Sequence, residues 1–130
     1  MVIRREMTGF VANRLAFALL REAIHLVKEE VVNVEELDKI VTSSMGPRWA
    51  VWGPFKSYYA GGGSGGLEAL FENIGETVQE CWDDAGRENV GEGWEQEIFR
   101  QCENKFGRVD TVVRDMATAS VLKAANRPDR

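Results

Sequence analysis

A long helical pattern in the first third of the chain limits the fold more than any other feature of the sequence. Between residues 12 and 27, apolar side chains recur on one helical stripe, and a second apolar stripe lies beside it. The first stripe contains Ala12, Leu15, Ala16, Leu19, Ala23, Leu26 and Val27, and the second contains Phe17, Leu20 and Ile24. Only a narrow polar strip remains for solvent. We therefore predict a helix covered on several sides, either at the centre of the domain or at an interface.

The two ends of a second helix, over residues 34–44, are indicated by their flanking residues. Asn33 can cap the first turn, and Glu36 stands at the position that closes a capping box. Gly46 followed by Pro47 predicts the end of this helix, because glycine accepts the left-handed conformation and proline lacks the backbone donor.

Three later segments also repeat apolar residues at helical spacing, over residues 67–85, 94–106 and 109–122. Gly75 is a weak point in the first of them, where the helix could kink. No segment alternates with the period of two that a half-buried strand requires. The sequence therefore predicts an all-α fold, with a single domain over residues 1–130 built as a helical bundle of about five helices.

Residues 47–66 are predicted to form an aromatic and glycine-rich loop region. Its rings belong to Trp49, Trp52, Phe55, Tyr58 and Tyr59, and Gly53-Pro54 interrupts the segment. Two interpretations remain open. The loop could pack on its own rings, or the rings could form the wall of a ligand pocket or a mouth that closes on a partner domain.

The run Gly61 to Gly66 matches the spacing G-x-G-x-x-G of dinucleotide-binding loops and precedes a predicted helix. A dinucleotide loop needs a buried strand before its first glycine, and residues 56–60 do not provide one. We interpret the run as a flexible connection, with a loose anion-binding helix start as the alternative. No cofactor-binding residue is predicted in this chain.

Composition excludes several classes of function. The net charge of −5 and the lack of a basic cluster argue against a nucleic-acid-binding protein. No apolar run approaches the roughly 20 residues needed to cross a bilayer, and residues 1–6 do not resemble a secretory leader. The chain is expected to be soluble and cytoplasmic.

The cysteines and the single histidine predict no metal centre. Cys81 and Cys102 are far apart in the sequence and are expected to be core thiols in a reducing compartment. With only one histidine, a zinc site is not expected. His25 is interpreted as a packed or surface residue of the first helix and not as a general base.

Two polar residues in apolar surroundings are the candidates for a functional site. Asn13 lies in an apolar run, so its amide must find a partner within the apolar wall, cap the helix start or face a cleft. Arg48 stands beside the rings of Trp49 and Trp52, and its guanidinium could bind a carboxylate or phosphate of a substrate. Stacking of Arg48 on one of these rings is the structural alternative.

Three stretches of the sequence together resemble a known family. They are Gly-Phe-Val-Ala-Asn-Arg-Leu at residues 9–15 with the helix that follows, Val-Glu-Glu-Leu-Asp at 34–38, and Gly-Pro-Arg-Trp-Ala-Val-Trp-Gly-Pro-Phe at 46–55. They resemble the C-terminal helical domain of the 3-hydroxyacyl-CoA dehydrogenases, enzymes of fatty acid metabolism. The lambda-crystallin (L-gulonate 3-dehydrogenase) and carnitine dehydrogenase branch is the most similar, over about residues 6–75.

This resemblance implies the substrate-side and dimerisation half of an NAD-dependent 3-hydroxyacyl-CoA or 3-hydroxyacid dehydrogenase. Asn13 matches the family's asparagine beside the catalytic histidine, near the substrate's 3-oxygen, and Arg48, Trp49 and Trp52 are the candidates for substrate binding. NAD would be bound by an N-terminal Rossmann domain that this chain lacks, so the chain alone is not expected to transfer hydride. The resemblance also implies a homodimer in which the first helix packs against a second copy.

Two other functions stay open at the level of the sequence. The helical domain could have become a free-standing protein that catalyses a non-redox reaction or binds a small molecule at its aromatic loop. It could instead be a structural or interaction module without a ligand.

Overall fold

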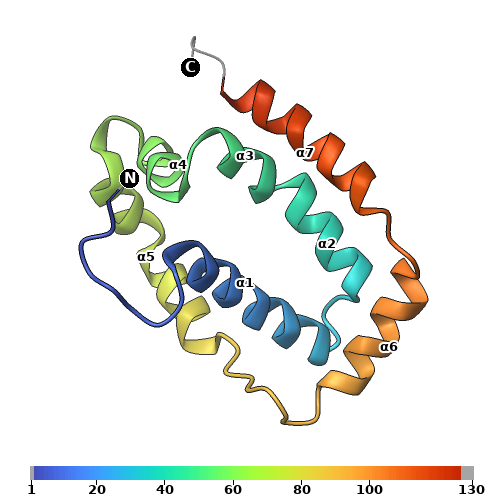
Figure 1. The fold of residues 1–130 in the computed structure, drawn as a ribbon. Coiled ribbons are helices and arrows are strands. Elements are labelled where there is room, and N and C mark those ends of the chain that lie inside the picture. Colours follow the sequence, from blue (N-terminus) through green and yellow to red (C-terminus); the bar gives the residue numbers. More distant parts are fainter. Residues whose placement is uncertain (1, 127–130) are drawn as a thin grey trace.

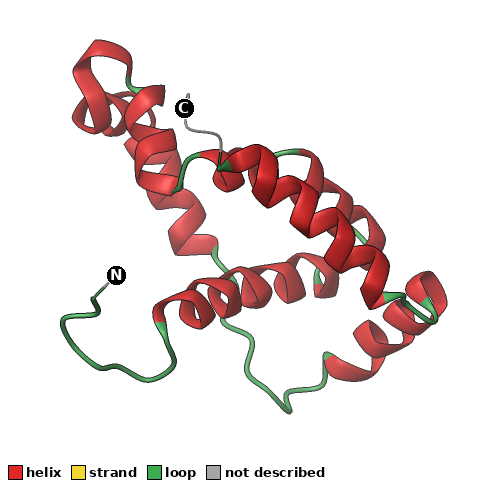
Figure 2. Cartoon of the chain, turned by 45° about the horizontal axis from the view of Figure 1, so that its top comes forward, coloured by secondary structure: helices red, strands yellow, loops and turns green. Residues whose placement is uncertain are grey.

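The computed structural model describes residues 2–126, which form seven α-helices and one short 3-10 helix. The helices are α1 (Val11–Lys28), α2 (Val34–Ser43), α3 (Met45–Val51), α4 (Pro54–Gly61), α5 (Gly66–Asp84), α6 (Glu95–Phe106) and α7 (Thr111–Ala125), with η1 (Gly63–Gly65) between α4 and α5. Figures 1 and 2 show the arrangement, in which no strand occurs within residues 2–126. The all-α prediction is confirmed.

The two helices beyond the five predicted, α3 and α4, occupy most of the segment 47–66, so its description as a loop was wrong. Pro54 is the first residue of α4, where its fixed φ suits a helix start and its missing donor is not needed. Pro47 lies in the first turn of α3 for the same reason. Consequently α2 ends at Ser43, before the predicted stop at Gly46 and Pro47.

The glycine run between α4 and α5 forms a tight turn. Gly66 has a φ of 65°, and a Cβ at this position would lie 2.9 Å from Cε2 of Tyr59. A Cβ on Gly62 would lie 1.6 Å from the carbonyl oxygen of Gly66. The glycines therefore allow the backbone to approach itself and the Tyr59 ring, and the interpretation as a flexible connection gives way to this close-packed turn.

Local signals for α2 and α5 agree with the structure. The Asn33 side chain accepts a hydrogen bond of 2.9 Å from the backbone N–H of Glu36, whose own carboxylate accepts one of 2.9 Å from the backbone N–H of Asn33. This reciprocal pair is the predicted capping box. α5 continues through Gly75 as one helix.

The helices pack as an open frame around a very small core. α1 packs against α2 and α6, and α3 connects α2 to both α4 and α7. α5 packs chiefly on α4, so the α4–α5 hairpin projects from the rest of the chain (Figure 2). Among the described hydrophobic residues only Val27 and Val34 are buried, where the end of α1 meets the start of α2. Cys81, predicted to be a core thiol, is exposed on α5 because this hairpin is uncovered.

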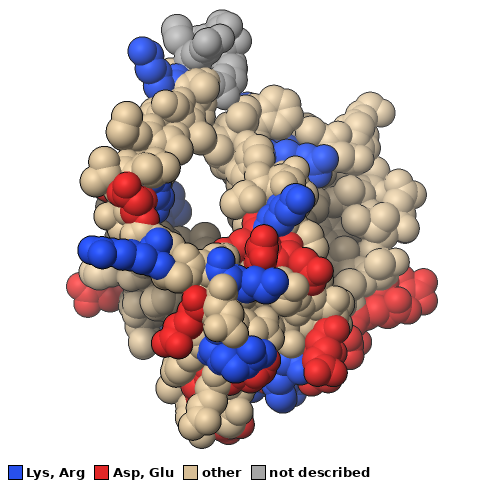
Figure 3. All heavy atoms as spheres, turned by 90° about the vertical axis from the view of Figure 1, so that its right-hand side faces the viewer, with Lys and Arg blue, Asp and Glu red and all other residues tan. Residues whose placement is uncertain are grey.

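The accessible surface of the chain is far larger than its mass requires. It measures 11092 Å², whereas a folded monomer of 14.6 kDa typically exposes about 6,900 Å². Figure 3 shows an opening through the molecule, which adds to this area. The excess of about 4,200 Å² includes many large hydrophobic side chains. None of the described helices is long and apolar enough to cross a membrane.

Candidate functional site

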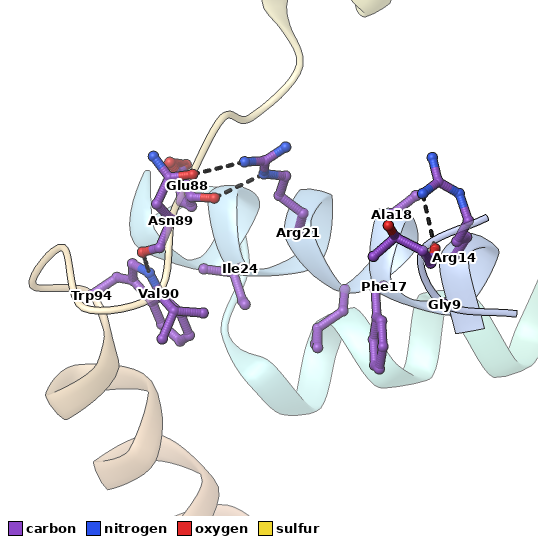
Figure 4. Close-up of a pocket in the computed structure, with 12 residues that line it drawn as sticks. Gly9, Arg14, Phe17, Ala18, Arg21, Ile24, Glu88, Asn89, Val90 and Trp94 are labelled. Carbon is purple, nitrogen blue, oxygen red and sulfur yellow. Dashed lines mark hydrogen bonds between the residues drawn. The ribbon is translucent and has the colours of Figure 1, made fainter.

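A loop formed by residues 85–94, here called the crossing loop, connects α5 to α6 by passing over α1. Arg21 of α1 fixes this loop with two hydrogen bonds. Its Nε donates to the backbone oxygen of Glu88 at 2.8 Å, and its Nη2 donates to Oδ1 of Asn89 at 2.9 Å (Figure 4). Arg21 thereby contacts two residues that lie 67 and 68 positions further along the chain.

Glu22 and His25 of α1 hold the start of the crossing loop, where its backbone comes closest to the helix. The carboxylate of Glu22 accepts a hydrogen bond of 2.8 Å from the backbone N–H of Gly86. A Cβ on Gly86 would lie 2.3 Å from Cβ of His25, so only glycine lets the loop pass this close to the helix. The polar strip of α1 is therefore used to hold another segment of the same chain.

His25 and Glu88 form an ion pair at the centre of this contact. The imidazole Nδ1 of His25 pairs with the Glu88 carboxylate, whose side chain is only 10% exposed, and Lys28 Nζ lies 3.8 Å from the second carboxylate oxygen. The hydrogen bond that Nδ1 of His25 donates to the Glu88 carboxylate raises the pKa of His25 above its ordinary 6.5, and the charges of Glu88, Glu22 and Glu29 act in the same direction against the effect of burial. His25 is thus a packed structural residue, as the sequence predicted.

This ion pair makes a pH dependence of stability measurable. Because the folded pKa of His25 is raised, the pairing stabilises the fold below the ordinary pKa of 6.5, and this contribution is lost as pH rises through the folded pKa. When the pH is raised from 6 to 8.5, we expect the urea midpoint of unfolding to decrease more for the wild type than for Glu88→Gln, which lacks the carboxylate. As a control, Glu97→Gln should leave this pH dependence unchanged, since the exposed Glu97 has a pKa of about 2. Parallel curves for wild type and Glu88→Gln would contradict the assignment.

An open cavity of about 740 Å³, here called the α1 groove, lies along α1 under the crossing loop (Figure 4). It is lined by Thr8, Gly9, Arg14, Phe17, Ala18, Leu20, Arg21, Ile24, Glu88, Asn89, Val90 and Trp94. Both arginines already have partners, because Arg14 Nη1 donates to the backbone oxygen of Thr8 at 3.1 Å and Arg21 holds the crossing loop. The lining is otherwise largely apolar, which suits the burial of an apolar partner surface.

Asn13 lies in the first turn of α1 and is exposed, so its amide has no partner within an apolar wall of the described chain. The N-cap of α1 is Phe10, and no side chain caps this helix start. The Asn13 side chain makes no hydrogen bond to another described residue. The helix-cap and core-amide interpretations are thereby excluded, and the carboxamide can bind a group supplied from outside the described residues.

The structure does not bring the other predicted substrate-binding residues next to Asn13. Arg48 and Trp49 lie on α3, Trp52 is its C-cap, and α3 is not a principal packing partner of α1. The cation on the Trp52 ring is Lys56, whose Nζ lies 4.7 Å from the ring centroid, so Arg48 does not stack there. Arg48 is exposed and forms no ion pair with a described residue.

The chain forms an all-α domain with a small core, and its apolar faces are not covered by other described residues. Residues 9–91 match the family model described as the C-terminal domain of 3-hydroxyacyl-CoA dehydrogenase. The chain therefore belongs to this family. The match contains α1 to α5 and most of the crossing loop, whereas α6 and α7 follow it.

Curated relatives extend the similarity over nearly the whole chain. An L-carnitine dehydrogenase of Oceanobacillus iheyensis is 37% identical over 79% of this chain and 34% of its own length. L-carnitine dehydrogenases of Streptomyces griseus and Streptomyces coelicolor are 34% and 32% identical over 98% and 94% of this chain, which correspond to 39% and 40% of their own lengths. The chain thus spans about a third to two-fifths of these relatives.

Proposed function

We propose that this chain is the substrate-side and dimerisation domain of a cytoplasmic, NAD-dependent 3-hydroxyacid or 3-hydroxyacyl-CoA dehydrogenase whose cofactor-binding half is a separate domain. The observation that carries the proposal is the uncovered apolar surface of α1 in a chain of this family. Phe10, Leu15 and Phe17 are 75%, 64% and 63% exposed. A helix apolar around most of its girth is stable in water only when other surfaces cover it.

Two covering surfaces account for this exposure. A second copy of the chain packs on the apolar faces of α1, and the cofactor-binding domain covers the start of the helix near Asn13. Obligate interfaces bury about 2,000 to 5,000 Å² or more in total. The excess surface of about 4,200 Å² per chain is large enough for both.

The residues of this chain do not fit a dinucleotide. The Gly61 to Gly66 run starts at the end of helix α4 instead of after a strand, and it closes into a turn in which a Cβ on Gly62 would lie 1.6 Å from the carbonyl oxygen of Gly66. NAD is therefore assigned to the separate domain, and no step on the cofactor is derived from this chain.

Asn13 is the residue proposed to act on the substrate. Its carboxamide donates a hydrogen bond to the 3-oxygen of the substrate, which gains negative charge during oxidation or reduction, and this contact also holds the substrate in register. The role requires a carboxamide without an internal partner, and Asn13 has no hydrogen bond to another described side chain or backbone group.

Arg48, Trp49 and Trp52 stay the candidates for recognising the rest of the substrate, although within one chain α3 is not a principal packing partner of the helix that carries Asn13. L-carnitine, the substrate named for the relatives, carries a carboxylate and a quaternary ammonium group. A guanidinium binds the first group, and an indole ring attracts the second. Because Lys56 Nζ already lies 4.7 Å from the centroid of the Trp52 ring, a substrate cation would replace this contact or use the Trp49 ring.

A ligand panel distinguishes this proposal from its two alternatives. By calorimetry and thermal unfolding, we expect no NAD binding by the chain alone, because the cofactor site lies on the other domain. A repurposed binding domain would instead be stabilised by a small acid or acyl-CoA thioester, by about 2.7 kcal/mol at 100 times the dissociation constant. A structural module would respond to no ligand and would also fail to support activity with a cofactor-binding domain. Tight NAD uptake by the isolated chain would contradict the proposal.

A further inference from the structure

α7 exposes apolar side chains that its own chain does not cover. This helix packs chiefly against α3, near a cavity lined by residues of its C-terminal half such as Val121 and Ala125. In its N-terminal half, Val112, Val113 and Met116 are 63%, 63% and 69% exposed. A helix that is apolar on more than one face needs a second covering surface.

A second uncovered apolar surface lies on the projecting α4–α5 hairpin. It is a groove of about 300 Å³, here called the α4–α5 groove. Its lining contains four aromatic rings and no charged side chain, and consists of Pro54, Phe55, Tyr58, Leu67, Leu70, Phe71, Ile74, Val78 and Trp82. A flexible thioether such as that of methionine fits an irregular, ring-lined groove well.

The two helices differ in charge. α5 carries six acidic residues, Glu68, Glu72, Glu76, Glu80, Asp83 and Asp84, and no Lys or Arg. Residues 108–125 carry three basic residues, Arg108, Arg114 and Lys123, against the acidic Asp110 and Asp115. α5 is thus strongly acidic, whereas residues 108–118 are neutral overall, with Arg114 already paired to Asp115, so the N-terminal half of α7 brings no like charge against α5.

The two surfaces cannot meet within one chain, because they lie on opposite sides of the open frame (Figure 1). We propose that the N-terminal half of α7, through Met116 and its apolar neighbours, packs into the α4–α5 groove of a second copy of this chain. This inference rests on the dimer of the proposed function and adds a contact to that of α1. A two-fold axis makes the same contact twice, so each copy buries both its groove and its α7, which are part of the large excess surface.

Such an exchange of helices has a consequence that a simple face-to-face contact lacks. In a homodimer of either single variant, Ile74→Asp in the groove or Met116→Asp on α7, both contacts are damaged. In a mixed dimer of the two variants, both substitutions fall in one contact and the other contact is intact. Mixing the variants must therefore restore association in part.

The experiment is sedimentation equilibrium of the full chain, its two variants and their mixture. Each variant alone should raise the dimer dissociation constant on the order of 10²-fold or more, and the mixed dimer should dissociate at least about tenfold less readily than either. Asn73→Asp and Thr118→Asp, exposed polar positions on the same two helices, are the matched controls and should leave the dimer unchanged. Circular dichroism should be unchanged for every variant, since Ile74 and Met116 are exposed. If an aspartate variant loses helicity, Ile74→Asn or Met116→Gln replaces it.

The outcomes separate the two levels of the proposal. A monomeric wild type would contradict the dimer of the proposed function itself. A dimeric wild type that either aspartate variant leaves intact would overturn the helix exchange alone, and so would variants that dissociate without recovery on mixing. Recovery in the mixture would support the exchange.

Discussion

Replacing Asn13 by Ala is expected to lower kcat/KM by roughly 10²- to 10³-fold in an enzyme completed with a cofactor-binding domain, as removal of one oxyanion-stabilising donor typically does. The carboxamide is lost without disturbing the domain, because the side chain is exposed and has no hydrogen-bond partner among the described residues. The measurement is steady-state kinetics of NADH formation from a 3-hydroxy acid such as L-carnitine, together with the unfolding midpoint.

The matched control is Asn73→Ala, which removes the same group from an exposed helical position on α5. It should leave both kinetics and stability close to those of the wild type. If Asn13→Ala retained full activity, or lost activity only in proportion to lost stability, Asn13 would not contact the substrate.

Phe17→Asp is expected to dissociate the dimer. Covering a phenylalanine contributes about 1.5 to 3 kcal/mol, and a two-fold interface contains the residue twice, so about 3 to 6 kcal/mol would be lost. The dissociation constant should rise by roughly 10²- to 10⁴-fold. Sedimentation equilibrium measures this change directly.

Val31→Asp is the control for this prediction, because Val31 is 65% exposed, as Phe17 is 63% exposed, but lies in the turn after α1. It should not alter the dimer. The monomer fold should survive Phe17→Asp, since this ring is outside the small core. A Phe17→Asp protein that remains dimeric at micromolar concentration would remove α1 from the interface.

The sequence predicted those parts of the fold that depend on local chemistry. The capping box of Asn33 and Glu36 and the apolar periodicity of α1 act within one or two turns, so their signals stand in neighbouring residues. α3 and α4 were missed because Gly and Pro at a helix start resemble the same residues at a helix end. The prolines at 47 and 54 were interpreted as stops, although both lie in first turns.

The packing of the crossing loop had no local signal. Arg21, Glu22 and His25 bind partners more than sixty positions away, and their spacing alone also fits a solvated helix face. The sequence also could not predict which apolar faces are exposed in a single chain. The apolar spacing on α5 predicts a covered face but does not indicate whether the same chain or another one covers it. Cys81 was therefore placed too deep within a single chain.

The rate of NADH formation from L-carnitine and NAD tests the account most directly. It is measured for this chain alone, for the segment of the Oceanobacillus iheyensis L-carnitine dehydrogenase that this chain does not match, and for both together. We predict turnover only in the mixture, or in a chimera that joins the two where the mixture does not associate. Turnover by this chain alone, or a folded chimera that binds NAD and oxidises no 3-hydroxy acid, would contradict the account.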